Sequence, residues 1–146
     1  NSRSVPAGVV VEQIARLGGM IAFHTGPDAY EKTHPLRALR IAERFPDTPV
    51  LLAHMGMADD AMNEACVRAA ETQSNLYLIG SGTTATLIHR AITRVGAERV
   101  LFGSDAPFKF PRVELAMYRA LLDTEFGEST ARLVLGGNVE RLFGFG

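Results

Sequence analysis

The chain has 146 residues, 47% of them hydrophobic, which is the length of one ordinary domain with enough apolar side chains for a core. Its formal net charge is −1 and its 15 basic residues are scattered singly, which argues against nucleic acid or an anionic membrane as a partner. A single cysteine excludes an internal disulfide, no apolar run reaches the roughly 18 residues that cross a bilayer, and no signal-peptide pattern opens the chain. We therefore expect a cytoplasmic protein.

The first half of the chain alternates helical patterns with short apolar runs. The patterns predict a helix over 9–17, a strand over 20–24 and a helix over 34–45. Pro46 and Pro49 end that helix and lead into a strand over 50–54. A helix over 59–73 follows, and its spacing predicts that these residues face inward: Ala61, Met62, Ala65, Cys66 and Ala69.

The second half continues the same alternation. A strand over 76–79 is predicted, then a turn at Gly80-Ser81-Gly82 and a helix over 84–95 that stops at Gly96. A strand over 99–103 precedes Asp105, and Pro111 opens a helix to about residue 123. Two short helices, 129–135 and 139–143, close the chain; Gly136-Gly137 is expected to separate them and Asn138 to cap the second.

Strands that alternate with helices of this length predict βαβ units and a parallel sheet, so the fold class is α/β. A closed (β/α)₈ TIM barrel needs eight strands and typically about 250 residues, whereas four strands are predicted here. The chain is therefore expected to be one unit, 1–146, either a small open sheet or half of a barrel. It begins in mid-pattern, which suggests a fragment.

Three of the predicted strands run directly into a polar side chain: His24, His54 and Asp105. The carboxyl ends of parallel strands are where α/β barrels keep their active sites. His24 fits a metal ligand, and His54 fits either a second ligand or an acid–base group. Asp105 fits a ligand that also accepts a proton, rather than a cap of the next helix, because Pro107 and the gap to Pro111 intervene. Together they predict a metal-dependent enzyme.

Other side chains are expected at the same mouth. Ser81, Tyr30, Phe108 and Lys109 are the candidate substrate contacts, with the Lys109 ammonium suited to a carboxylate. His34 and His89 are expected to be structural or surface residues. A Ser–His–Asp triad from Ser81 or Ser104 is set aside because no Gly-x-Ser-x-Gly elbow is present, and the chain shows no phosphate-binding glycine motif.

Four segments, taken in order, resemble the amidohydrolase superfamily, in its amidohydrolase-related branch of metal-dependent hydrolases and decarboxylases. They are IAFHTG at 21–26, FPDTPVLLAHMG at 45–56, LFGSDAPF at 101–108 and LGGNVERLFG at 135–144. The resemblance implies a distorted (β/α)₈ barrel of which this chain is the C-terminal half, strands five to eight. It also implies a divalent metal, with zinc favoured and manganese, iron or cobalt as alternatives.

By the same resemblance, His24 is the metal ligand of strand five, and Asp105 is the strand-eight ligand that handles the proton of the attacking water. His54 is the strand-six histidine, an acid–base catalyst in the decarboxylases and a ligand in hydrolases with two metals. The family's first-strand His-x-His or Glu-x-His pair is absent from this chain. We therefore expect that a missing N-terminal half-barrel, or another copy in a homo-oligomer, completes the metal site.

The resemblance implies a hydrolase that activates water on the metal to cleave an ester, lactone or amide of a small-molecule substrate. One alternative is a non-oxidative decarboxylase of an aromatic or unsaturated carboxylic acid. A second alternative is a non-catalytic fragment or a self-associating half-barrel, whose exposed strand edges would favour association.

Overall fold

The computed structural model of the chain describes residues 7–144, and its centre is a four-stranded parallel sheet in the order β1-β2-β3-β4. The strands are β1 (Ile21–His24), β2 (Val50–Ala53), β3 (Leu76–Ile79) and β4 (Val100–Leu101). The prediction of a parallel α/β sheet is confirmed. β4 is shorter than the strand predicted over 99–103.

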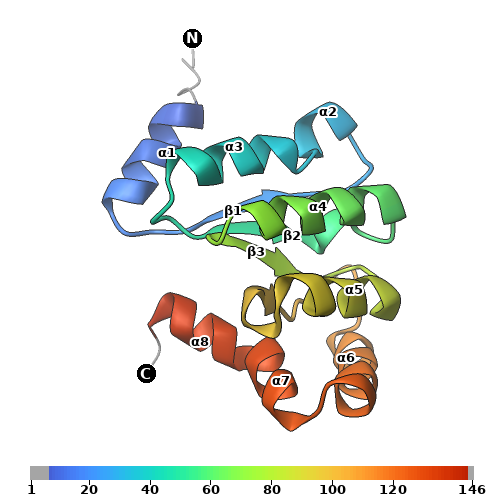
Figure 1. The fold of residues 1–146 in the computed structure, drawn as a ribbon. Coiled ribbons are helices and arrows are strands. Elements are labelled where there is room, and N and C mark those ends of the chain that lie inside the picture. Colours follow the sequence, from blue (N-terminus) through green and yellow to red (C-terminus); the bar gives the residue numbers. More distant parts are fainter. Residues whose placement is uncertain (1–6, 145–146) are drawn as a thin grey trace.

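Helices precede, connect and follow the strands, from α1 at the blue N-terminal end to α8 at the red C-terminal end (Figure 1). They are α1 (Ala7–Arg16), α2 (Tyr30–Thr33), α3 (Leu36–Arg44), α4 (Asp60–Thr72), α5 (Ala85–Val95), α6 (Pro111–Glu125), α7 (Glu128–Arg132) and α8 (Asn138–Phe143). The short turn α2 is the helix that the sequence patterns did not predict. Within the described residues, no helix is both long enough and apolar enough to span a membrane.

The helices cover one face of the sheet. On that face the side chains of β2, β3 and β4 are fully inaccessible: Val50, Leu52, Leu76, Leu78 and Val100. On the opposite face Leu51 and Leu101 are buried, but Ala22 is exposed and Tyr77 and Ile79 are only half-buried. Parallel sheets are normally covered on both faces, so this one-sided cover agrees with the predicted half of a barrel.

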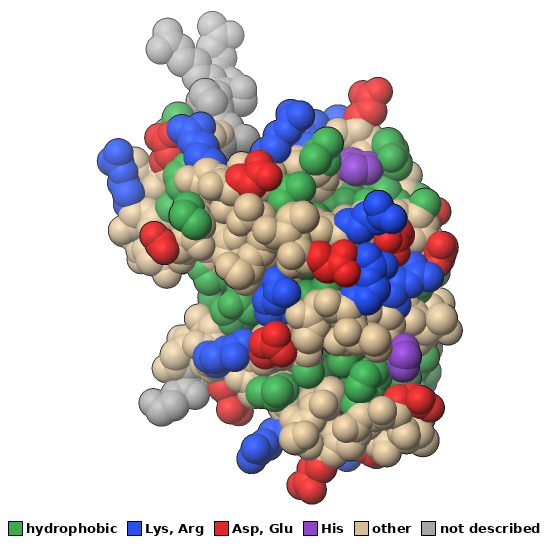
Figure 2. Space-filling model, viewed as in Figure 1, with side chains coloured by type: hydrophobic (Ala, Val, Ile, Leu, Met, Phe, Trp, Pro, Cys, Tyr) green, Lys and Arg blue, Asp and Glu red, His purple; other side chains and the backbone are tan. Residues whose placement is uncertain are grey.

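An ion-pair cluster joins the outer surfaces of α4 and α5, where acidic and basic side chains are interspersed (Figure 2). Arg94 bridges Glu64 and Glu71 at 2.6 and 2.8 Å, and Arg68 reaches Glu64 at 2.7 Å. Arg68 and Arg94 lower the pKa of Glu64 to about 2. Each such partly exposed pair contributes little to stability, and Arg94 connects α5 to two carboxylates of α4.

The predicted inward face of α4 was right in part and the predicted break at Gly136-Gly137 was wrong. Met62, Cys66 and Ala69 are buried as predicted, but Ala61 is exposed and Val67 and Ala70 are buried, so the inward face of α4 is rotated from the predicted one. Gly136-Gly137 does not separate the two last helices. Gly137 has helical angles (φ −56°, ψ −34°), and η3 (Leu133–Gly137), a π-helical turn, joins α7 to α8.

Asn138 is consequently not a cap. Its side chain is completely buried, and its Nδ2 donates hydrogen bonds to the carbonyl oxygens of Ala97 at 2.7 Å and Val100 at 2.8 Å. The carboxamide therefore attaches the C-terminal helix to the start of β4. Helix-capping rules could not reveal this role, since both bonds join residues about 40 positions apart in the sequence.

We expect Asn138→Ala to lower the free energy of unfolding by roughly 2–3 kcal/mol, because two carbonyl oxygens lose their donor. Urea unfolding monitored by circular dichroism measures this loss. Ser129→Ala, at an exposed position of α7, is the control and should stay within about 0.5 kcal/mol of the unmodified chain. Equal stability of the two variants would contradict the structural role of the Asn138 amide.

Candidate active site

The carboxyl end of the sheet brings together the three side chains predicted to converge there. The His24 and His54 rings meet edge-on, with centroids 4.8 Å apart. Nδ1 of His54 lies 3.9 Å from Oδ1 of Asp105, and both side chains are largely buried, at 17% and 20% exposure. The predicted proximity is thus present, because parallel strands deliver their carboxyl ends to one edge of the sheet.

His54 sits in an unusual turn, η1 (His54–Gly56), that directly follows β2. Its φ is +69°, Met55 has +36° and Met57 has +59°, values that non-glycine residues rarely adopt. Such a turn persists only where the surrounding structure holds it.

Three side chains from other segments hold this turn. Thr25 Oγ1 accepts a hydrogen bond from the Gly56 N–H and donates to the Ala53 carbonyl oxygen. Asn63 Nδ2 donates to the Met55 carbonyl at 3.0 Å, and Thr83 Oγ1 donates to that of Met57 at 2.6 Å. Asn63 and Thr83 have no motif that points to this role; only their places after β2 and β3 bring them to the turn.

The hydrogen bonds of the His54 ring define which of its nitrogens is available for chemistry. Nδ1 lies 2.8 Å from Ser81 Oγ and 3.1 Å from the Ser81 carbonyl oxygen. A carbonyl oxygen can only accept, so we assign the proton of the neutral ring to Nδ1. The lone pair of Nε2 is then available to accept a proton or to bind a metal.

Ser81, His54 and Asp105 do not form a hydrolytic triad. In a triad, serine and carboxylate use opposite ring nitrogens, so that a proton taken from one side is balanced on the other. Here Ser81 and Asp105 both approach Nδ1. Asp105 also does not cap α6, whose N-cap residue is Phe110 and has no side-chain hydrogen bond.

Gly82 lets the loop after β3 approach the two side chains closely. Its φ is +65°, and a Cβ there would lie 3.3 Å from Asp105 Oδ2 and 3.7 Å from His54 Nδ1. A side chain at this position would therefore occupy the space between loop and site.

His24 has a carboxylate neighbour that the sequence analysis missed. Its Nε2 lies 2.9 and 3.1 Å from the two carboxylate oxygens of Asp28. The hydrogen bond from His24 lowers the pKa of Asp28, so this carboxylate stays ionised beside the ring. Carboxylates commonly orient histidines in this way, and the Gly-Pro-Asp turn four residues after the histidine was the available signal.

The predicted substrate contacts lie in different surroundings. Ser81 is buried against His54, whereas Tyr30 is 57% exposed and its ring packs edge-on against His34. Phe108 is 85% exposed, and it lies with Lys109 in the loop between β4 and α6.

The remaining polar candidates have structural surroundings. His34 Nδ1 accepts a hydrogen bond from the Leu36 N–H, and His89 packs on the ring of Phe126. Burial raises the pKa of Cys66 to about 12, so its thiol stays protonated at neutral pH and is unsuited to bind a metal.

The donors at the carboxyl end of the sheet fit part of a metal site. Two imidazoles and a carboxylate are the ligand types that zinc and manganese take. Between residues 7 and 144, however, no group of three or more His, Cys, Asp or Glu side chains is close enough to hold an ion. Catalytic zinc sites usually have three protein ligands, so these residues account for part of a coordination sphere.

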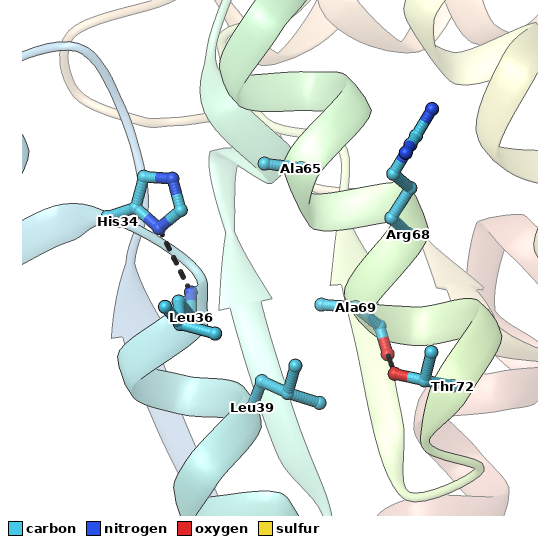
Figure 3. A pocket seen from close by; sticks show the side chains of 7 residues that line it. All are labelled: His34, Leu36, Leu39, Ala65, Arg68, Ala69 and Thr72. Carbon is cyan, nitrogen blue, oxygen red and sulfur yellow. Dashed lines mark hydrogen bonds between the residues drawn. The ribbon is translucent and has the colours of Figure 1, made fainter.

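An apolar pocket lies apart from this site, between α3 and α4 (Figure 3). It is lined by His34, Leu36, Leu39, Ala65, Arg68, Ala69 and Thr72. None of the three convergent side chains contributes to it, so it belongs to the helical layer rather than to the carboxyl end of the sheet.

The chain matches the sequence model of a family described as amidohydrolase, over residues 6–145. No curated protein matches it. Solved structures do, and the chain spans about half the length of those it matches.

Three of these structures illustrate the likeness. A TIM-barrel protein from Bordetella bronchiseptica has a TM-score of 0.75 and 22% identity, over 97% of this chain and 51% of that one. A dihydroxybenzoic acid decarboxylase from Polaromonas sp. JS666, with bound manganese and 2-nitroresorcinol, has a TM-score of 0.68 and 21% identity, over 92% and 52%. An amidohydrolase from Burkholderia multivorans with bound zinc has a TM-score of 0.69 and 14% identity, over 92% and 55%. These likenesses show the fold, one half of a TIM-type barrel.

Proposed function

We propose that this chain, which belongs to the amidohydrolase family, supplies acid–base and metal-binding residues to a metal-dependent hydrolase. Such an enzyme would activate water to cleave an ester, a lactone or an amide of a small-molecule substrate. The observation that carries the proposal is the meeting of His24, His54 and Asp105 at the carboxyl ends of parallel strands. Imidazole and carboxylate at one such mouth are suited to moving protons on and off a bound substrate.

In this proposal His24 and Asp105 hold a divalent metal, with Asp28 orienting the His24 ring. When bound, the metal would lower the pKa of water and polarise the substrate carbonyl. Zinc is the favoured ion and manganese, iron or cobalt the alternatives; zinc and manganese occur in the similar structures. An N-terminal half-barrel or a second copy of the chain would supply the further ligands.

His54 is the proposed acid–base group. With Nδ1–H held by Ser81, its Nε2 lone pair can take up a proton from solvent and pass it to the leaving group, while an Asp105 oxygen accepts one from the attacking water and returns it to solvent. Phe108 and Lys109 are proposed to contact substrate from their loop, where an aromatic face and a positive charge suit an acidic aromatic molecule. Tyr30 and Ser81 are the further proposed contacts, Ser81 through its link to His54.

A decarboxylase of an aromatic or unsaturated acid is the second candidate. It is favoured by the similarity in fold to the dihydroxybenzoic acid decarboxylase and by an acid–base histidine with one nitrogen free. In that reaction the carbon–carboxylate bond breaks, its electron pair stays on carbon as carbon dioxide leaves, and His54 Nε2, having taken up a proton from solvent, delivers it to that carbon.

Metal uptake by the purified chain tests the proposal first. Titration with Zn²⁺ and with Mn²⁺ should give a saturable site, and Asp105→Asn should weaken it at least about 10–100-fold, because a charged ligand is lost. Asp123→Asn, at an exposed position of α6, is the matched control and should bind like the unmodified chain. Equal uptake by both variants overturns the metal-site proposal for this chain. Absence of uptake overturns the version in which a second copy of the chain supplies the further ligands.

The products then separate the two reactions. Metal-loaded protein is incubated with 4-nitrophenyl acetate and, separately, with a dihydroxybenzoic acid. Release of nitrophenol supports the hydrolase, whereas release of carbon dioxide supports the decarboxylase. Metal uptake with neither product, together with a concentration-dependent mass in solution, would favour the self-associating half-barrel.

A further inference from the structure

Tyr118, in the middle of α6, has a buried hydroxyl with a specific partner. Its side chain is completely inaccessible, and its Oη donates to the Gly80 carbonyl oxygen at 2.6 Å. The ring also packs edge-on against Phe102, with centroids 5.0 Å apart. Burial, reinforced by the Glu114 carboxylate, raises the pKa of the phenol, so the hydroxyl remains a hydrogen-bond donor. The core alone would be equally well filled by phenylalanine.

The Gly80 that receives this hydrogen bond is fixed from several sides. Its N–H donates to the Leu101 carbonyl at 3.0 Å, which ties it to β4. A Cβ at position 80 would collide with the Tyr118 hydroxyl and would lie 2.7 Å from Met55 Cε, in the turn that carries His54. The loop after β3 is therefore clamped between α6, β4 and the His54 turn.

Ser81, the next residue, connects this loop to His54 through two contacts with the imidazole. It is 5% exposed, and both its hydroxyl and its carbonyl oxygen lie at hydrogen-bond distance from His54 Nδ1. A Cβ at position 103 would lie 2.8 Å from Ser81 Cβ. Ser81 therefore packs directly against Gly103, where no side chain would fit. A displacement of the Gly80–Ser81 peptide would change both contacts on the imidazole.

We infer that Tyr118 is a positioning residue, which acts through Gly80 and Ser81 to keep the proton of His54 on Nδ1 and the Nε2 lone pair free. The inference rests on the proposed function in one respect, that His54 is the acid–base group. Without the hydroxyl, the buried Gly80 carbonyl loses its hydrogen-bond donor. An unpaired buried carbonyl is unfavourable, so the Gly80–Ser81 peptide is expected to rotate toward another donor. Second-layer hydrogen bonds of this kind commonly select the tautomer of an active-site histidine.

The tautomer of His54 in the metal-free chain tests this role. Nitrogen-15 NMR of the neutral imidazole gives the ratio of the Nδ1–H to the Nε2–H form. We expect Tyr118→Phe to lower this ratio about fivefold, the effect of losing one typical hydrogen bond. Tyr77→Phe, at a half-buried position of β3, is the matched control and should leave the ratio unchanged.

A double-mutant cycle shows whether the effect passes through Ser81. Ser81→Ala removes the hydroxyl contact on Nδ1 but keeps the carbonyl oxygen on the same peptide. If both changes act through this residue, the combined effect of Tyr118→Phe and Ser81→Ala should depart from the sum of the single effects. Strictly additive effects would overturn the route through Ser81. A Tyr118→Phe protein that is less stable by urea unfolding but keeps the ratio of the unmodified chain would overturn the inference, since that is the result for a merely structural tyrosine. The readout needs neither metal nor substrate, so it can fail or succeed independently of the proposed reaction.

Discussion

His54→Gln is expected to lower the turnover number of the metal-loaded protein by about 10²–10⁴-fold, the usual contribution of a positioned acid–base group. Glutamine keeps an amide N–H that can still donate to the Ser81 carbonyl, so the turn around position 54 retains a hydrogen bond there. It cannot exchange a proton at neutral pH, however, and that is the function assigned to Nε2. The measurement is the rate of product release at saturating substrate.

The control for this variant is His89→Gln. His89 lies on α5 against the ring of Phe126, away from the strand ends, and its replacement should leave turnover within about twofold. The affinity for Zn²⁺ separates the two roles that His54 can have. We expect His54→Gln to bind the ion as the unmodified chain does. A parallel loss of affinity and turnover would make His54 a ligand and would contradict its assignment as the acid–base group.

Gly56→Ala is expected to destabilise the chain by about 3 kcal/mol or more, the upper range for overpacking a buried site. The glycine has φ +92°, and a Cβ there would collide with Asn63 N and lie 2.6 Å from Met62 C and 2.9 Å from Asn63 Cα. These are backbone atoms of the first turns of α4, which cannot rotate away as a side chain can. Urea unfolding gives the loss.

Gly144→Ala provides a control, because it separates backbone strain from collision. Gly144 is in the left-handed region, with φ +67° and ψ +30°, and nothing lies within 4 Å of its Cβ position. It should therefore lose only the roughly 1–2 kcal/mol that a left-handed conformation costs an alanine. Equal losses for the two variants would show that the contact between the His54 turn and α4 is looser than these distances indicate.

The contact between the His54 turn and the start of α4 also supports the positive φ angles of His54, Met55 and Met57. Asp59 caps α4 by accepting from the Met62 N–H at 2.8 Å, and Asn63, one turn further along, holds the Met55 carbonyl. The start of α4 and the turn thus brace each other. The angle at which His54 enters the site is consequently set by α4 as much as by β2.

Much of the site could be predicted from local pattern. The apolar runs before His24, His54 and Asp105 indicated strands, and strands alternating with helices of this length predict a parallel sheet, whose carboxyl ends lie at one edge. The Asp28 partner of His24 had a local signal, the Gly-Pro-Asp turn, and was missed. The Ser81 partner of His54 was beyond such reasoning, because it depends on how the loop after β3 closes. The buried role of Asn138 was mispredicted for a related reason, since a local capping rule was applied to a residue whose partners are distant in sequence.

The sequence by itself determined the order of strands and helices, the parallel sheet and the types of side chain at the strand ends, because these follow from hydrophobic period and chain direction. Tertiary structure alone decided which nitrogen of His54 is held, since Ser81 lies 27 residues away and arrives by a separate βα unit. It also decided that Tyr118, outwardly a core residue, hydrogen-bonds the loop that carries Ser81. Hydrogen bonds need orientation as well as proximity, and orientation is set only when the loops pack against one another.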